Sequence, residues 1–423
     1  MADRFGSGQL PHGSRILMEH VPHSRAFSLG FFFPTGSRSD PVGKAGLAHL
    51  VEHLVFKGTQ SYSTSELARM VDRVGGDLNA WTDREELAFS CSVPSEHWET
   101  SVKVLLELCF SPRFPEEELE REKEVIRNEI LATFEDPEEM SYDNFLQNLD
   151  PGLWSRPVAG TPESLSGLTL NDVKLWHHQH VSPNHLVIVA CGNFNSRDLR
   201  NTLEAGLKQL TPTEPFNSRT EFSPVWFCRV VAAEFQMVQV LSGWCFPRPK
   251  TLREAIVWQV FSMLWGETMS SRLFQSLREE RGLCYSVGSQ IFDTDQDWGL
   301  QFFATAAPEH SRAVVEALSE QVKMLVSQPP SLEEWEDSRQ SLRGGMLLGS
   351  EKMEARVSRL WKYFQSFGVQ ESFEASMETL DHPVTREEQL KVLGTLSHQR
   401  PVLLVWGKTR LRSSRSLEAL WAV

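Results

Sequence analysis

The chain has 423 residues, of which 40% are hydrophobic and 23% are charged, and its formal net charge is −14. This length suggests two or more domains, and the composition is ordinary for a soluble globular protein with a large core. The acidic charge argues against binding to nucleic acid or to an anionic membrane surface. The longest apolar run, residues 186–191, is far too short to span a bilayer.

The cysteines and the first residues indicate a cellular compartment. None of the 6 cysteines forms a C-x-x-C pair, and most lie among apolar residues, so we expect reduced and buried thiols. The N-terminal sequence MADRFGSGQLPHG lacks the apolar segment of a secretory signal. We therefore expect a cytoplasmic protein, or a periplasmic one if a leader precedes Met1.

Hydrophobic periodicity and turn residues divide the first half of the chain into alternating strands and helices. In chain order we expect two strands within 15–33, a helix within 44–59, a helix from Ser63 or Thr64 to Gly75, strands over 77–82 and 86–93, an amphipathic helix after Ser95, a charged helix from Pro115 to Pro137, and a buried strand within 185–193.

The second half of the chain repeats this order. Residues 208–224 contain three prolines and little apolar periodicity, which is typical of an interdomain linker. After it we expect strands at 225–233, 236–244, 283–292, 299–306 and 401–407, and helices at 252–265, 270–280, 308–327 and 332–350. The pattern predicts a duplication with a period of about 200 residues. We expect an α+β fold with homologous domains at 1–207 and 225–423, each a mostly antiparallel sheet flanked by helices.

The sequence KAGLAHLVEHLVFKGT at 44–59 contains His49, Glu52 and His53 in an H-x-x-E-H arrangement. On a helix the two histidines lie one turn apart on one face, with Glu52 beside them, so both imidazoles can bind one metal ion. The residues around them are apolar, and we therefore expect a deeply buried helix whose polar face is compensated by a metal. The alternative is a pair of core histidines that are satisfied by hydrogen bonds.

Two histidines on one helix, with a carboxylate from elsewhere, form a common zinc site that leaves one position for water. Bound zinc lowers the pKa of that water to about 7 and polarises a carbonyl group. Glu52 is placed to take the proton of the water as a general base and to pass it to a leaving amine. The motif inverts the order of the H-E-x-x-H signature of other zinc peptidases.

The charged helix offers candidates for the carboxylate. Glu122 and Glu129 are seven positions apart, which is two helical turns, so they point the same way. Ile126 and Ile130 lie near that face and suggest that it turns inward. Composition alone does not select Glu129 from the other acidic residues of this helix.

A second group of histidines occurs in WHHQHVSPNH at 176–185. It could be a second metal site. We favour the alternative, a helix C-terminus where histidines complement the helix dipole, followed by a turn that contains proline.

The segments GSRSDPVGKAGLAHLVEHLVFKGT and EKEVIRNEI resemble the inverted-motif zinc peptidases, a family that includes pitrilysin, insulin-degrading enzyme and the mitochondrial processing peptidase. The resemblance covers nearly the whole chain. It implies a metallohydrolase fold of the processing-peptidase type and one Zn²⁺ per chain. It also implies Glu129, which lies 76 residues after His53, as the third ligand, and Glu122 as a residue that orients ligands or water.

Two further segments resemble the same family. GGDLNAWTDREE is similar to its edge strand, which implies that Asn79 and Ala80 contact the substrate backbone as the peptide adds a strand. The alternative is an ordinary hairpin. SSRLFQSLREERGLCYSVG is similar to its Arg/Tyr segment, which implies that Arg278 and Tyr285 bind the scissile carbonyl and stabilise the oxyanion. The alternative is a surface arginine in an ion-pair network and a packed tyrosine.

The resemblance implies a zinc-dependent endopeptidase that cuts short or unfolded peptides. Two-domain relatives work as dimers that enclose a chamber, so Arg278 and Tyr285 are expected to serve the active site of the partner chain. A homodimer suffices because this chain carries both sets of residues, and a heterodimer with an inactive paralogue is the alternative. Two other hypotheses are a non-catalytic peptide-binding scaffold and a metal-dependent hydrolase or lyase with a non-peptide substrate.

Overall fold

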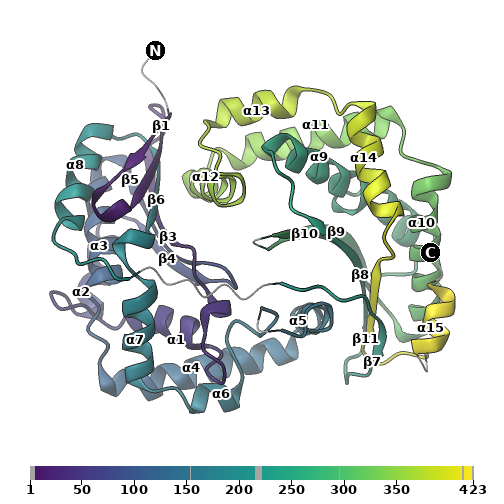
Figure 1. Cartoon of the computed structure of the whole chain (residues 1–423), viewed down its shortest axis with the longest axis horizontal. Coiled ribbons are helices and arrows are strands. Elements are labelled where there is room, and N and C mark those ends of the chain that lie inside the picture. Colours follow the sequence, from purple (N-terminus) through teal and green to yellow (C-terminus); the bar gives the residue numbers. More distant parts are fainter. Residues whose placement is uncertain (1–4, 153, 215–221, 295, 412–413, 422–423) are drawn as a thin grey trace. The chain divides into compact units, whose positions relative to one another are not determined.

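The computed structural model describes residues 5–152, 154–214, 222–294, 296–411 and 414–421 (Figure 1). The chain forms two compact units. Unit 1 comprises residues 1–132, 156–221 and 349–375, and unit 2 comprises residues 133–155, 222–348 and 376–423. Of the expected linker at 208–224, residues 215–221 lie outside the described part of the chain.

Unit 1 is built on a sheet that, within the described residues, has six strands in the order β1-β2-β6-β3-β5-β4. Only β2 and β6 pair in parallel; all other neighbours are antiparallel. The strands are β1 (Phe5–Gln9), β2 (Arg15–His20), β3 (Ala26–Phe33), β4 (Asp77–Thr82), β5 (Leu87–Pro94) and β6 (Val187–Gly192).

Unit 2 has a sheet of five described strands in the order β7-β11-β8-β10-β9. They are β7 (Cys228–Val231), β8 (Val238–Pro247), β9 (Ser286–Asp293), β10 (Asp297–Ala306) and β11 (Val402–Trp406). Here β7 and β11 are parallel and the other neighbours antiparallel. Order and direction both match those of β2, β6, β3, β5 and β4, which confirms an α+β fold with two homologous, mostly antiparallel domains.

Helices cover both sheets. Those of unit 1 are α1 (Leu47–Val55), α2 (Thr64–Asp72), α3 (Trp98–Phe110), most of α4 (Glu116–Glu135), α6 (Pro162–Ser166), α7 (Leu170–His180), α8 (Ser196–Leu207) and α12 (Met353–Phe367). Those lying wholly or mostly in unit 2 are α5 (Pro137–Leu149), α9 (Leu252–Ser262), α10 (Ser311–Ser327), α11 (Leu332–Gly349), α13 (Phe373–Asp381), α14 (Arg386–Ser397) and α15 (Ser414–Leu420). No helix within the described ranges combines the length and apolar character that a membrane span requires.

The two halves of the sequence exchange one helix each. Helix α12 comes from the second half of the chain but packs on the unit 1 sheet, where Trp361 stacks on Phe32 of β3 with ring centroids 4.7 Å apart. Because α12 covers one face of β3 while Phe31 and Phe33 face the opposite core, the strand is apolar on both sides. This explains the continuous apolar run in its sequence.

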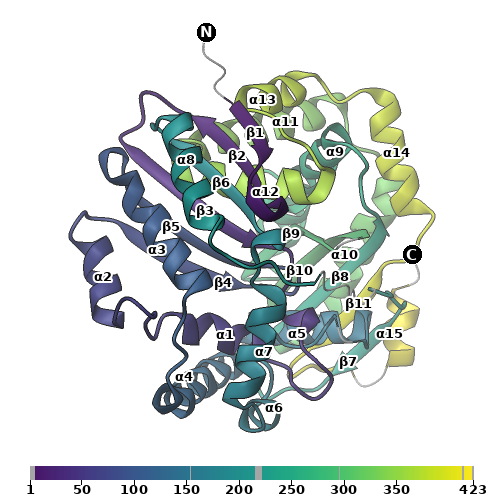
Figure 2. The same ribbon diagram turned by 60° about the vertical axis from the view of Figure 1, so that its left-hand side comes forward.

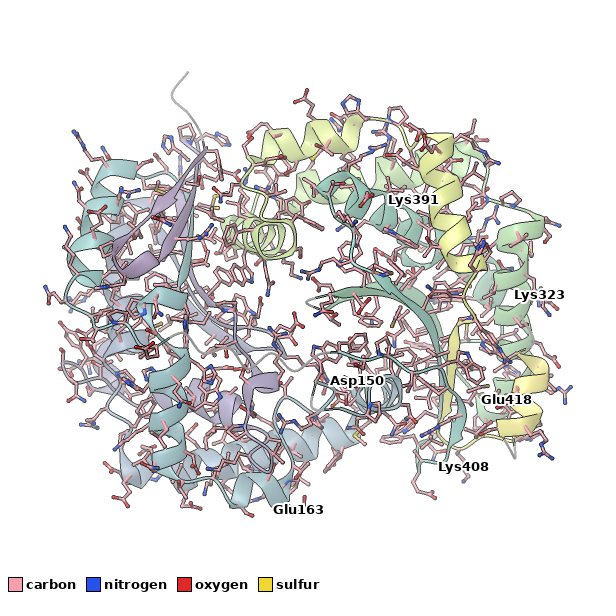
Figure 3. The ribbon with its side chains drawn as sticks, viewed as in Figure 1. Asp150, Glu163, Lys323, Lys391, Lys408 and Glu418 are labelled. Atoms are coloured by element: carbon pink, nitrogen blue, oxygen red, sulfur yellow. The ribbon has the colours of Figure 1, made fainter. Side chains whose placement is uncertain are left out.

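Helix α5 makes the reverse exchange. It follows the charged helix α4 in sequence, yet Phe145 and Leu149 pack in unit 2 against Leu241 of β8 and Leu404 of β11. Asp150, labelled in Figure 3, directly follows the last turn of this helix. The compact units therefore depart from the expected boundaries at 1–207 and 225–423 at these two helices, because each sheet needs a cover that the other half of the sequence supplies.

A buried cluster of charges fixes α12 to the unit 1 sheet. Glu19 of β2 is 2% exposed and accepts hydrogen bonds from the guanidinium groups of Arg356 and Arg359. The ring of Phe373 lies against both guanidinium groups, with centroids 4.7 Å and 5.4 Å away. Removal of the carboxylate would take from Arg356, whose side chain is 9% exposed, its acidic partner in a low-dielectric environment, where an uncompensated charge is costly.

We expect Glu19→Gln to lower the free energy of unfolding by about 3–5 kcal/mol, because breaking a buried ion pair leaves the opposite charge unpaired. Denaturant unfolding with chelator present measures this loss without a contribution from metal binding. The matched control is Glu124→Gln, whose carboxylate pairs with Arg127 at the surface with side chains 59% and 35% exposed. It should cost less than about 1 kcal/mol, and equal losses in the two variants would contradict the role of Glu19.

Candidate metal centre

The helix that carries the H-x-x-E-H residues is held at its N-terminus by a carboxylate from the preceding loop. Asp40 accepts hydrogen bonds from the backbone N–H groups of Gly46, Leu47 and Ala48 at 2.8, 3.0 and 2.9 Å. Burial raises the pKa of Asp40 to about 7, although these three donors oppose the rise. Gly46 has φ +90°, and a Cβ there would lie 2.5 Å from the carbonyl oxygen of Ala159, so only glycine fits this entry into the helix.

Helix α1 is deeply buried, as its sequence predicts. It packs against α7 and near β4 (Figure 2). Its buried residues line the side and ends of the helix around the polar face: Leu47, Ala48, Leu50, Val51, Leu54 and Val55. The imidazoles and the carboxylate of the motif are therefore surrounded by apolar side chains, where polar groups need partners.

The structure brings the three predicted metal ligands together. One ligand atom from each of His49, His53 and Glu129 lies within 4.8 Å of the other two. Oε2 of Glu129 is 3.8 Å from Nε2 of His49 and 3.5 Å from Nε2 of His53. Among the described residues, no other group of three histidine, cysteine or acidic side chains is gathered in this way.

The chemistry of these donors fits zinc. Burial, and then the proximity of His53, lowers the pKa of His49 to about 4, so this imidazole is neutral at pH 7 and available as a ligand. Two imidazole nitrogens and one carboxylate oxygen are a common protein contribution to a catalytic zinc site. The carboxylate of Glu129 reaches both Nε2 atoms from α4, so each residue presents its donor to one common point.

A second acid on α4 supports His53. Oε2 of Glu122 lies 3.1 Å from Nδ1 of His53, and Oε1 lies 2.7 Å from Nζ of Lys57. Glu122 is 5% exposed and Ile126 is fully buried, so this face of α4 turns inward as predicted. A carboxylate on Nδ1 fixes the tautomer and the orientation of the ring so that Nε2 is free for a metal. Lys57 was missed by the sequence analysis, although it lies one turn after His53.

Glu52 is held by a residue that the sequence analysis did not identify. Oγ1 of Thr82, at the end of β4, donates a hydrogen bond of 2.5 Å to Oε2 of Glu52. Burial raises the pKa of Glu52, and the Thr82 hydrogen bond opposes this rise. The neighbouring Trp81 donates to Glu86, which also accepts a hydrogen bond from the indole of Trp361 on α12. The end of β4 is thereby fixed from two sides.

The predicted substrate strand is an edge strand. β4 is the last strand in the order of the unit 1 sheet, and Asn79 is exposed on it. Oδ1 of Asn79 accepts a hydrogen bond of 2.9 Å from the backbone N–H of Ala80. A peptide that binds to this N–H must therefore first displace the Asn79 side chain.

Arg278 and Tyr285 belong to unit 2, whereas the three metal-binding candidates belong to unit 1. Arg278 is exposed in the π-helical segment Phe274–Glu280, and its guanidinium lies 4.8 Å from the ring centroid of Phe274. Tyr285, just before β9, is 76% exposed. Within the described part of the chain Arg278 takes part in no ion pair. Neither the ion-pair network nor the packed tyrosine of the alternative interpretation is found.

The histidine group at 176–185 has a structural role. It lies at the C-terminal end of α7, where His177 Nε2 donates to the carbonyl of Cys109 at 2.9 Å and His180 Nδ1 pairs with the Thr35 hydroxyl at 2.9 Å. Burial lowers the pKa of His177 to about 4 and that of His180 to about 3, so both rings are neutral. The expected position at a helix C-terminus is confirmed, but neutral rings carry no charge to complement the helix dipole, and these two histidines serve as hydrogen-bond partners instead. All six cysteines are free, as expected.

Comparison with known proteins relates the whole chain to a family of zinc proteases. Residues 15–150 match the family model "Insulinase (Peptidase family M16)", and residues 167–342 match "Peptidase M16 inactive domain". An uncharacterized zinc protease of Mycobacterium leprae is 30% identical over 406 residues, covering 92% of this chain and 88% of the relative. The uncharacterized zinc protease YmxG of Bacillus subtilis is 28% identical over 362 residues, covering 82% and 85%.

Solved structures share the fold. A Pseudomonas fluorescens structure described as a peptidase M16 inactive domain superimposes with a TM-score of 0.86 at 17% identity, covering 96% of this chain and 98% of that one. A protease from Helicobacter pylori gives a TM-score of 0.83 at 20% identity, covering 95% and 99%. At these identities the likeness concerns the fold alone.

We expect Glu122→Gln to weaken zinc binding by roughly 10–100-fold, because the ring of His53 loses the carboxylate that orients it. Competition with a chromogenic chelator measures the affinity directly and needs no peptide cleavage. Glu118→Gln, one turn earlier on α4 with its carboxylate paired to the 71% exposed Arg121, is the matched control and should change affinity less than about twofold. An affinity for Glu122→Gln equal to that of the control would show that the carboxylate does not support the metal ligand.

Proposed function

Because this chain belongs to peptidase family M16, the insulinase family, and its relatives are named zinc proteases, we propose that it is a zinc-dependent endopeptidase acting on short or unfolded peptides. The observation that carries the proposal is the convergence of His49 and His53 of the buried helix α1 with Glu129 of α4, whose ligand atoms lie within 4.8 Å of one another. Glu52 lies on α1 next to His53. A scaffold protein has no need to keep this set intact.

His49, His53 and Glu129 would hold the metal. When bound, zinc lowers the pKa of a water molecule and polarises a carbonyl group. The residues of the chain do the remaining work. Glu122 orients His53, and the low pKa of His49 keeps that imidazole unprotonated at neutral pH.

Glu52 acts as the general base and then as the general acid. Its carboxylate receives the proton of the attacking water and delivers it to the nitrogen of the leaving amine. Burial raises its pKa, which strengthens it as a base, while Thr82 holds Oε2 and directs the other oxygen toward the substrate. A base whose pKa lies closer to neutrality transfers a proton in both directions more readily than an exposed glutamate.

The edge strand β4 binds the peptide in extended form. Its outer side is free in the described sheet, so a substrate strand can add to it through backbone hydrogen bonds. The carbonyl of the peptide takes the place of Asn79 Oδ1 on the N–H of Ala80, and the released Asn79 amide contacts the substrate backbone. This requirement for an extended strand excludes folded proteins as substrates.

Arg278 and Tyr285 stabilise the carbonyl oxygen as it gains negative charge, and they do so from a partner chain. Both side chains are exposed, and the phenol of Tyr285 and the guanidinium of Arg278 are hydrogen-bond donors suited to an oxyanion. Two chains then enclose one reaction chamber with two equivalent sites. A homodimer is the simplest such assembly; a heterodimer with an inactive paralogue uses the same contacts.

The second candidate function is a peptide-binding scaffold without catalysis. The exposed edge strand would support it, and the relatives named as zinc proteases are themselves uncharacterized. The intact metal-binding set argues for the enzyme, since a scaffold needs the strand but not the histidines.

Replacement of Glu52 by glutamine tests the proposed chemistry. The variant should retain zinc and lose activity on a quenched fluorescent peptide by about 10²–10⁴-fold, because the amide cannot accept the proton. Wild-type protein treated with chelator is the control for metal-dependent activity, and metal analysis verifies that the variant stays loaded. Full activity in the loaded variant would refute the role of Glu52, and a loaded wild-type protein that cuts no peptide in a diverse library would favour the scaffold.

Mixing two inactive variants tests catalysis across a dimer. Glu52→Gln and Arg278→Ala chains should complement each other, because mixed dimers combine one intact metal site with one intact arginine. After subunit exchange at equal amounts, about a quarter of wild-type activity is expected, since half of the dimers hold one good site of two.

The matched control is the double variant Glu52→Gln/Arg278→Ala mixed with wild-type protein. If Arg278 acts from the partner chain, these mixed dimers have no intact site. If it acts within its own chain, they retain one intact site, and the mixture of single variants shows no rescue. The two mixtures therefore give opposite results for the two arrangements.

A further inference from the structure

The last two residues of β4 are contacted on opposite faces of the unit 1 sheet. Successive side chains of a strand point to opposite faces. Thr82 meets helix α1, where it donates to Glu52, whereas Trp81 packs in the apolar cluster on the other face, to which α12 contributes. The proposed mechanism uses the Thr82 hydroxyl but assigns no role to the contacts on the α12 face.

Glu86 joins the end of β4 to α12. Its Oε1 accepts a hydrogen bond of 2.7 Å from the indole N–H of Trp81, and its Oε2 accepts one from the indole N–H of Trp361. Both indoles also lie against Phe32 of β3, with ring centroids 5.8 Å and 4.7 Å away. Because hydrogen bonds are directional, donors on both oxygens hold the carboxylate in one orientation.

Glu86 also binds the residues on both sides of Thr82. Its carboxylate holds the side chain of Trp81, which precedes Thr82, and its backbone carbonyl accepts a hydrogen bond of 2.8 Å from the N–H of Asp83, which follows it. Thr82 itself pairs with Leu87, the first residue of β5. The backbone that carries the Thr82 hydroxyl is thus tied to Glu86, and Glu86 is tied to α12.

A second set of contacts holds the same hairpin from the loop before α1. The backbone N–H groups of Ser37 and Arg38 donate to the carbonyl oxygens of Asp83 and Arg84 at 3.0 and 3.1 Å. These bonds fix the backbone of the turn between β4 and β5. Loss of the Trp361 hydrogen bond is therefore expected to shift the end of β4 without unfolding the hairpin.

We propose that Glu86 and Trp361 are positioning residues for the proton transfer by Glu52. Trp361 orients the carboxylate of Glu86, Glu86 orients the end of β4, and β4 presents the Thr82 hydroxyl to Oε2 of Glu52. The second oxygen of Glu52 is then held in one direction for the proton. This role rests on the proposed function, because Glu52 is the base of that reaction.

A double-mutant cycle tests this role through kcat on a quenched fluorescent peptide, with zinc loading verified for each variant. Trp361→Phe keeps an aromatic ring on Phe32 and removes the indole donor, and Thr82→Val keeps the side-chain shape and removes the hydroxyl. Alone, the first should lower kcat about three- to tenfold and the second about tenfold or more, since each removes a hydrogen bond that orients the base. In the Thr82→Val background, Trp361→Phe should lower kcat less than about twofold, because the hydroxyl that it positions is gone.

A merely structural role of Trp361 gives a different result. If its loss only loosens the core, kcat falls by the same factor with and without the Thr82 hydroxyl, and equal factors would overturn the proposal. Thr82→Ser keeps a hydroxyl and should restore the sensitivity of kcat to Trp361→Phe. A rise of KM at unchanged kcat would also overturn the proposal, because the contacts would then serve substrate binding rather than the base.

Trp176→Phe is the matched control for the lost ring volume. Trp176 is also 2% exposed in unit 1, but within the described residues its indole N–H has no hydrogen-bond partner. Its kcat should stay within about twofold of wild type, because no hydrogen bond is lost. Equal losses in the two phenylalanine variants would assign the effect to volume and contradict the role of Trp361.

Hydrogen exchange of the metal-free protein supplies a readout that needs no catalysis. Trp361→Phe and Glu86→Gln, whose amide offers one acceptor oxygen instead of two, should each raise exchange over 77–82. Exchange over 98–110, in helix α3 on the opposite face of the sheet, should stay unchanged. If wild-type protein cuts peptides and neither kcat nor exchange responds, the positioning role fails and the proposed function stands. If exchange responds but loaded wild-type protein cuts no peptide, the proposed function fails and the contacts serve no base.

Discussion

The metal-binding face depends on how helix α1 is held. Three hydrogen-bonded contacts from separate parts of unit 1 fix it: Asp40 at the helix N-terminus, Glu122 of α4 on His53, and Thr82 of β4 on Glu52. In each contact a polar group of the buried helix α1 gains a hydrogen-bond partner, because the apolar side chains around the helix offer none. A site that must align donor atoms to within about half an ångström needs such support from residues that never touch the metal.

The two units share an architecture but differ in the residues that could carry chemistry. Both units use the same strand order, but only the first carries H-x-x-E-H. The exchange of α5 and α12 means that neither half of the sequence contains all the helices that cover its own sheet. The Trp361 indole extends this dependence toward the metal centre, because it shares Glu86 with Trp81, next to Thr82.

Local sequence patterns predicted the elements and the core of the site well. Apolar positions around His49 and His53 predicted a buried helix, and Ser63 forms the capping box that starts α2. Glu129 was selected by the resemblance to the family, because the many acidic residues of its charged helix cannot be told apart by their neighbours in the sequence. Arg278 and Tyr285 are exposed, and their role in catalysis stays a proposal.

The sequence by itself determined the H-x-x-E-H face and the duplication, because these depend on residue spacing within one helix and on the order of the elements along the chain. The edge position of β4 was implied by the resemblance to the family and is found in the sheet order. Only the tertiary structure decided that Asp40, Lys57 and Thr82 support the motif and that the covering helices are exchanged. Most of these features arise from contacts between residues far apart in the chain, such as Glu52 and Thr82, whereas Asp40 lies close in sequence to the N–H groups that donate to it. Contacts between distant residues leave no periodic signal, since a buried threonine looks the same in sequence whether its partner is a catalytic carboxylate or another side chain.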